Sequence, residues 1–175
     1  MSSTSTVPTN RIAASLINEM KNEIETTRKC LERVPAEKFG YKPHEKSMEM
    51  GRLASHIAEM FGWTAATING HELDFAKMEY KPFEPKTTAE LVEFFETKSS
   101  EALRTLESVP DEAFMETWTL RNGEQVYFTL PKVAVMRTFV MNHIVHHRGQ
   151  LSVYLRLNDI PVPGIYGPSA DEQTM

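Results

Sequence analysis

The sequence predicts an all-α protein, a four-helix bundle with a short hairpin or loop inserted before its last helix. Apolar residues recur at three- and four-residue spacing in four long segments, near residues 10–33, 48–69, 88–108 and 132–158. Proline or glycine lies at or just beyond the end of each segment. The 175 residues suffice for one sizeable core, so a single domain is expected over residues 9–175. Residues 1–8 are polar and lack apolar anchors, and they are expected to be disordered.

The first two segments have clear ends. The first segment ends before Pro35, which cannot continue a helix. The second follows Ser47, a residue type that favours the N-cap position, and Gly70 closes it. These signals predict two helices of about twenty residues.

The last two segments are delimited in the same way. Thr87 and Glu90 have the spacing of a capping box, which predicts the start of the third helix. Pro110 stops that helix, and Pro161 and Pro163 prevent the fourth from continuing.

Residues 117–130 separate the third and fourth helices. This stretch is rich in β-prone residues around Asn122-Gly123, a dipeptide typical of tight hairpin turns. It is interpreted as a short hairpin or an extended loop.

A short internal repeat relates the two halves of the chain. Residues 31–39 resemble residues 106–114, and each stretch ends a predicted helix. His56 and His143 then fall at comparable places in the following helices. A duplicated helix pair predicts that the second and fourth helices meet, each with an inward histidine.

Composition and charge exclude several classes of function. The formal charge is −5 and no cluster of Lys and Arg is present, which argues against nucleic acid as a partner. No apolar run reaches the length that spans a bilayer, so no membrane partner is expected. Met1 to Asn10 lacks the pattern of a signal peptide, and the single Cys30 fits a reducing compartment. A cytoplasmic location is therefore expected.

The candidate metal site lies in the fourth helix. His143 and His147 are four residues apart, so they share one helix face about one turn apart and can bind one divalent metal. His56 lies in the apolar stripe of the second helix and could be a third ligand. Taken alone, His56 is more often a hydrogen-bonded core histidine, and spacing alone leaves both interpretations open.

His146 is ambiguous, because it lies on the other side of His143 from His147. It could replace His147 as a ligand, carry protons behind the metal, face a neighbouring helix, or be a partly buried histidine with a hydrogen bond. The sequence contains no His-Glu-x-x-His, no Glu-x-x-His and no Cys-x-x-Cys motif. The other common metal patterns are thus absent.

Three further residues are weaker candidates. Gln150 shares the histidine face and could orient a ligand or bind substrate. Glu59, close to one turn after His56, could be a general base, although a solvated position is the plainer expectation. Arg148 points away from the histidine face and is expected at the surface or an interface, whereas Cys30 is expected to be a small core residue without a catalytic role.

These motifs resemble the DinB/YfiT-like family of metal-dependent enzymes. The resemblance is carried by His56, the run Asn142 to Leu151, and the closing Pro163 to Ser169. It implies a four-helix bundle, usually a homodimer, with His56, His143 and His147 holding a divalent metal. Nickel and zinc are the metals most often suspected in relatives, and one of them is expected here, with iron or manganese as the alternative. Some distant relatives are thiol S-transferases that use low-molecular-weight thiols.

The expected function is that of a metal-dependent enzyme whose three-histidine site activates water or a thiol, as a hydrolase or a thiol S-transferase acting on a small molecule. With no clear carboxylate base in the sequence, the thiol reaction is slightly favoured. The alternative is a non-catalytic metal-binding helical module with a structural or stress-response role.

Overall fold

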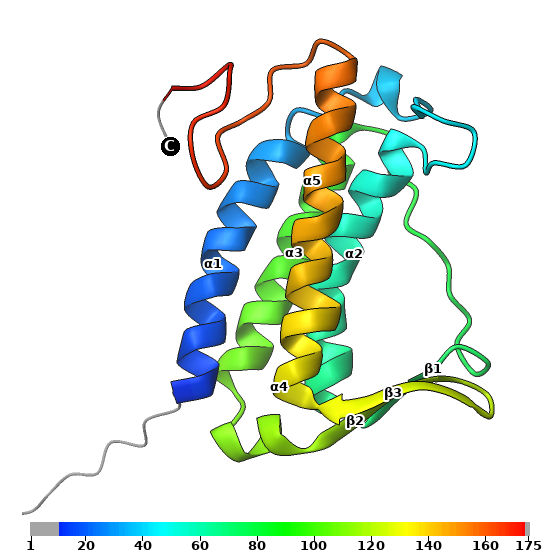
Figure 1. Ribbon diagram of the computed structural model, residues 1–175, viewed down its shortest axis with the longest axis vertical. Helices are drawn as coiled ribbons and strands as arrows, with labels where there is room; N and C mark the ends of the chain where they lie inside the picture. The colour runs from blue at the N-terminus through cyan, green and yellow to red at the C-terminus, as the bar shows by residue number, and fades with distance from the viewer. Residues whose placement is uncertain (1–10, 174–175) are drawn as a thin grey trace, which may run out of the picture.

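Four long helices run side by side, with a small sheet at one end, in the computed structural model, which describes residues 11–173 (Figure 1). The helices are α1 (Arg11–Leu31), α2 (Met50–Asn69), α3 (Thr88–Glu107) and a last one that starts with α4 (Lys132–Val135), passes through the π-helical turn η3 (Met136–Met141) and continues as α5 (Asn142–Leu157). All four predicted helices are therefore present. The disorder expected for residues 1–8 lies outside the described residues.

The apolar faces predicted by the spacing form the core between these helices. Leu16 of α1, Ile57 of α2, Phe95 of α3 and Leu151 of α5 are each at most 2% exposed. Burial of such side chains stabilises each by about 1.5–3 kcal/mol relative to exposure, which fixes the faces that the helices turn inward. No described helix is both long enough and apolar enough to span a membrane.

The start of α3 matches its predicted capping signal, whereas the start of α2 does not. The Thr87 hydroxyl accepts a hydrogen bond from the Glu90 N–H at 3.1 Å, as a capping box requires, while the Glu90 carboxylate accepts from the N–H of Lys86. Ser47 is not the N-cap of α2. That position is occupied by Glu49, and its side chain makes no capping hydrogen bond.

The prediction of an all-α fold is wrong, because a three-stranded sheet is present. Strands β1 (Glu72–Asp74), β2 (Thr117–Asn122) and β3 (Gln125–Pro131) lie in the order β1-β2-β3. Strands β2 and β3 form the predicted hairpin, whereas β1 pairs in parallel with β2. A three-residue strand is too short to show an alternating pattern, so only its pairing partner reveals it.

The hairpin turn depends on one glycine. Asn122 pairs with Gln125, so the two-residue loop is Gly123–Glu124, with Gly123 at φ +58°. Glycine adopts this left-handed backbone region without the steric cost that a β-carbon adds. The Asp74 carboxylate of β1 accepts a hydrogen bond from the Gly123 N–H at 2.8 Å, which ties the tip of the hairpin to the short strand.

The sheet is anchored to the C-terminal end of α2. Trp118 is 1% exposed and its indole N–H donates to the carbonyl of Ala66 at 3.3 Å. The buried Lys132 ammonium donates to the carbonyl of Ile68 at 2.7 Å and to the Glu116 carboxylate at 2.8 Å. Because these contacts satisfy polar groups at the helix end, the sheet holds a fixed position beside α2.

The internal repeat corresponds to a repeated local structure. Each of the two stretches leaves a long helix, passes a proline and enters a 3₁₀ turn, η1 (Ala36–Lys38) or η2 (Asp111–Met115). The helices that follow, α2 and α5, are in contact, as the repeat predicts.

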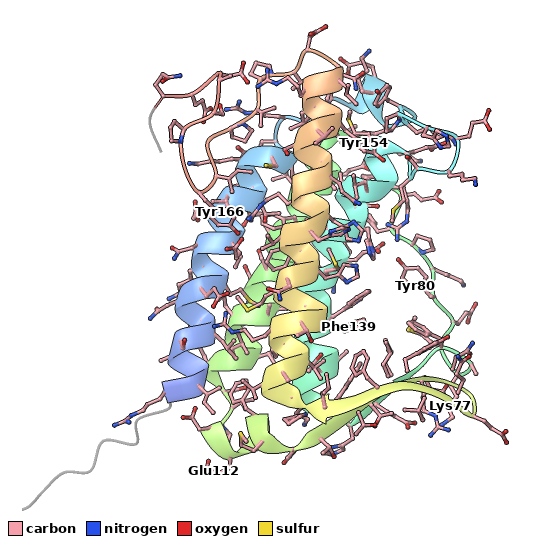
Figure 2. All side chains as sticks on the ribbon, viewed as in Figure 1. Lys77, Tyr80, Glu112, Phe139, Tyr154 and Tyr166 are labelled. Atoms are coloured by element: carbon pink, nitrogen blue, oxygen red, sulfur yellow. The ribbon has the colours of Figure 1, made fainter. Side chains whose placement is uncertain are left out.

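Arg148 is buried, contrary to the surface position expected from the sequence. Its guanidinium lies 2.6 Å from the Glu23 carboxylate and donates to the hydroxyls of Thr26 and Tyr166, both at 2.6 Å. Polar residues of α1 lie beside α5. The face of α5 opposite the histidines therefore packs against α1 instead of facing water. Tyr166, labelled beside α1 in Figure 2, is held through its hydroxyl while its ring remains exposed.

Removing this buried ion pair should destabilise the fold. Arg148→Ala leaves the Glu23 carboxylate buried without its partner, and we expect the free energy of unfolding to fall by about 3 kcal/mol. Urea denaturation measures this. The matched control is Arg156→Ala, which breaks an exposed pair with Asp171 and should change stability by less than about 1 kcal/mol. Equal effects of the two substitutions would contradict the structural role of Arg148.

The thiol of Cys30 should be unreactive in the native protein. Cys30 is fully buried, and burial raises the pKa of its thiol to about 11, so very little thiolate exists at pH 8. A colorimetric disulfide reagent at pH 8 should label Cys30 only after unfolding, and Cys30→Ser should retain the fold. Rapid labelling of the folded protein would show that this part of the core opens.

Candidate metal centre

Two helices bring three histidines together. His56 comes from α2 and His143 and His147 from α5, and one side-chain nitrogen of each lies within 4.8 Å of the other two. His147 is buried, and His56 and His143 are half-buried. The π-helical turn η3 ends immediately before α5, and such turns are frequent next to functional sites.

His147 and His143 face each other through their Nε2 atoms. The Oε1 atom of Gln150 is an acceptor 2.7 Å from His147 Nδ1, so that nitrogen carries the proton and Nε2 is free. The ring of His143 hydrogen bonds to the backbone of Phe139. The two Nε2 atoms are 2.9 Å apart. At this separation the two nitrogens share one proton in a hydrogen bond, and a metal ion could take the place of that proton between them.

His56 adds a third donor with an unsatisfied nitrogen. Its Nδ1 atom is buried and has no hydrogen-bond partner, and it lies 3.6 Å from the Glu59 carboxylate. The His56 ring centroid is 4.9 Å from that of His147 and 5.5 Å from that of His143. A carboxylate beside one ring nitrogen is a common way to orient a histidine that ligates a metal through its other nitrogen.

The electrostatics keep two of the imidazoles neutral. Burial, together with the neighbouring histidines, lowers the pKa of His147 to about 4, against the opposing effect of its hydrogen bond to Gln150. Burial and the proximity of His56 also lower the pKa of His143. A neutral imidazole is the form that binds a metal, so both rings are ready for ligation at neutral pH.

Glu59 is buried, contrary to the solvated position expected from the sequence. Its carboxylate accepts hydrogen bonds from the Tyr80 hydroxyl at 2.5 Å, the Phe83 N–H at 2.7 Å and the Arg52 guanidinium at 3.0 Å. Burial acts to raise the pKa of Glu59, but the interactions with His56 and these three partners outweigh it and lower the pKa to about 2. A carboxylate with so low a pKa is a poor general base at neutral pH.

Glu59 therefore serves as an anchor for the connection between β1 and α3. This connection runs along the outside of α2, with Tyr80 labelled on it in Figure 2. Sequence reasoning missed Arg52 and Tyr80. Arg52, His56 and Glu59 are spaced by four and three residues, a polar series on one face of an apolar helix that could have been noticed. Nothing in the sequence indicates that Tyr80 reaches this face.

The remaining candidates of the fourth helix lie at the edge of the cluster. Gln150 is exposed, yet its contact with His147 fits the ligand-orienting role among its two expected roles. His146 is exposed and its ring centroid is 4.9 Å from that of His147, outside the group of three nitrogens. The structure thus brings together the three predicted ligands and leaves His146 beside them.

A cleft of about 410 Å³ opens beside His56. Its walls come from α2, from β1 and the connection after it, from β2 and from η3. The polar residues Arg52, Tyr80 and Thr67 contribute to a lining that is otherwise mostly aromatic and aliphatic. The three histidines therefore adjoin a space large enough for a small molecule.

Three imidazole donors suit zinc, nickel or iron(II), and the described residues place no fourth histidine, cysteine or carboxylate in the same group. Three protein donors are typical of catalytic zinc sites, and four of structural ones. The three histidines are compatible with a metal site of the catalytic kind, with three protein donors.

Comparison with known proteins gives consistent matches. The chain is 25% identical over 151 residues to "Uncharacterized protein YrdA" of Bacillus subtilis strain 168, covering 86% of this chain and 85% of that protein. A crystal structure of a DinB-like protein from Bacillus cereus ATCC 10987 superposes with a TM-score of 0.68 at 20% identity, over 87% of this chain and 97% of that one. The DinB-like protein YjoA of Bacillus subtilis gives the same TM-score and identity, over 92% and 99%. The sequence profile of the DinB family matches residues 1–174, and the chain therefore belongs to the DinB family.

Proposed function

We propose that this protein is a metal-dependent enzyme in which His56, His143 and His147 hold a divalent metal, zinc or nickel, beside a substrate cleft. The observation that carries the proposal is the convergence of three imidazole nitrogens within 4.8 Å, next to a cleft that His56 helps to line. When bound, the metal would supply a Lewis acid that lowers the pKa of water or a thiol.

Among the two reactions, the structure supports thiol S-transfer more than hydrolysis. A hydrolase gains from a carboxylate base beside the metal, and the nearest carboxylate, Glu59, is occupied by three hydrogen bonds and has a pKa of about 2. In S-transfer the thiol gives up its proton, its sulfur forms the new bond to an electrophilic carbon, and the leaving group departs with the electron pair of the broken bond. Our candidate for the acceptor of that proton is His146, which is exposed beside His147.

The alternative function is a non-catalytic metal-binding module with a structural or stress-response role. A screen of the zinc- and nickel-loaded protein, purified without a histidine tag, separates the two. We expect transfer of a low-molecular-weight thiol to an electrophile, and weaker or absent ester hydrolysis. Metal binding without turnover in either assay would favour the alternative.

The homodimer implied by the family resemblance remains a proposal. Light scattering at micromolar concentration should give a mass of twice the 20.0 kDa of the chain. A mass equal to one chain would contradict it.

Each metal ligand should be required for metal binding. His56→Ala, His143→Ala and His147→Ala each remove one of three donors, and we expect zinc affinity to fall by more than about 100-fold, since losing a mere hydrogen-bond partner of a ligand costs 10–100-fold. Equilibrium dialysis followed by elemental analysis measures this. His146→Ala is the control and should retain the metal. If it loses the metal while His147→Ala keeps it, the ligand assignment is wrong by one residue.

Gln150 should act by orienting His147. Gln150→Leu removes the acceptor of the His147 Nδ1–H, and zinc affinity should fall by about 10-fold or more while the melting temperature stays nearly constant, because Gln150 is exposed. Gln150→Glu keeps an acceptor at this position and should restore affinity. An unchanged affinity for Gln150→Leu would leave the hydrogen bond without a role in ligation.

A further inference from the structure

We propose that the cleft beside His56 binds the uncharged apolar body of an elongated small molecule, an aromatic ring or a short hydrocarbon chain, and directs its reactive end to the three histidines. The placement of the reactive end rests on the proposed function. The apolar, uncharged character of the ligand body follows from four features of the cleft itself.

The inner wall is a continuous series of aromatic rings. Trp63 stacks on Phe139, with ring centroids 4.9 Å apart and planes 16° from parallel, and Phe139 lies 5.9 Å from Trp118. The Trp63 centroid is also 5.7 Å from His56 and 5.6 Å from His143. The wall therefore runs from the histidines to the sheet without a charged side chain.

The outer wall carries apolar side chains that are only partly covered. Leu73 is half-buried, while Phe75 and Met78 are 41% and 37% exposed. All three line the cleft. Large apolar side chains gathered around a concave site indicate a binding surface rather than ordinary exposed residues.

A buried hydroxyl without a partner lies at the far end of the cleft. Thr67 is 1% exposed, and its Oγ1 atom makes no hydrogen bond. Such groups are rare because each costs about 1–3 kcal/mol unless a partner satisfies it. Thr67 follows His56 by eleven residues of α2, a rise of about 16 Å. A ligand that reaches Thr67 from the histidines must therefore be elongated, with a hydrogen-bonding group at its distal end.

The charge balance selects an uncharged body. Arg52 is the one permanently charged residue that lines the cleft among residues 11–173, and its guanidinium is paired with the Glu59 carboxylate at 3.0 Å. An anionic substrate would thus find no free cation here. An uncharged apolar body needs no charged partner, and burying its surface against the apolar walls of the cleft favours binding.

The two tryptophans of the chain, Trp63 and Trp118, both line the cleft, so intrinsic fluorescence reports on its occupant. We would titrate the metal-free protein with straight-chain alcohols from butanol to octanol. The affinity should rise roughly fourfold for each added methylene group. Octanoate should bind at least about 10-fold more weakly than octanol, since its charge is unpaired here. No dependence on chain length would overturn the proposal, and equal binding of octanoate would overturn the uncharged assignment.

Substitutions in the cleft lining show where the alcohol binds. Phe75→Ser and Met78→Ser should each weaken octanol binding about fivefold or more. Thr67→Val should weaken it about fivefold while leaving the melting temperature equal or higher, because the buried hydroxyl has no partner to lose. The control is Val153→Ser, 55% exposed on α5 and outside the cleft lining, which should bind normally. If the control loses as much affinity as the cleft variants, the alcohol binds elsewhere.

A second comparison separates this proposal from the metal site. Octanethiol should bind the zinc-loaded protein at least about 10-fold more tightly than octanol, and His143→Ala should abolish the difference. If zinc is not held but the alcohols bind as expected, the proposed function fails and the apolar site stands. If zinc is held but cleft variants bind alcohols normally, the apolar site fails. If the protein binds both zinc and the alcohols but octanethiol binds no more tightly than octanol, the reactive end of the ligand does not lie at the histidines.

Discussion

The packing of α2 against α5 is the contact on which the candidate site depends. It places His56 beside His143 and His147 in a half-buried position, where neutral imidazoles are favoured and their nitrogens converge. Hydrogen bonds to His147 and His143 maintain this geometry. Gln150 sets the tautomer of His147 and the backbone of Phe139 holds His143. Rings held in this way need little reorganisation when a metal binds, which is the usual role of such outer contacts.

A second polar cluster holds the opposite side of α5. The buried pair of Arg148 and Glu23 joins this helix to α1, and Tyr166 brings the C-terminal segment onto the same pair. Helix α5 is therefore fixed through polar contacts on one face and presents its histidines on the other. Such buried ion pairs are weak evidence for net stability, but removing one partner is strongly destabilising. Their arrangement fixes the rotation of α5, and the rotation decides where the histidines point.

The small sheet and the connection after β1 shape the surroundings of the site. Trp118 and Phe139 meet where the hairpin packs against the end of α2 and the turn η3. Glu59 holds the connection in place through Tyr80 and Phe83. The histidines thus come from the bundle alone, whereas the cleft is built jointly by the bundle and by segments outside it. The bundle supplies the donors and about half of the cleft lining, and the segments outside the bundle supply the rest.

The sequence by itself determined the four helices and the shared face of His143 and His147, because both depend on local spacing along one helix, whereas the packing of α2 against α5 brought His56 to them. Apolar periodicity located α1, α2, α3 and the last helix, and the spacing of His143 and His147 put them on one face. Only the tertiary structure decided the features that join distant segments. Strand β1 is defined by its pairing with β2, Arg148 is buried by a partner 125 residues away, and Glu59 is covered by a connection that has no periodic signal. Such contacts depend on which surfaces meet in space, and no local pattern of residues specifies that.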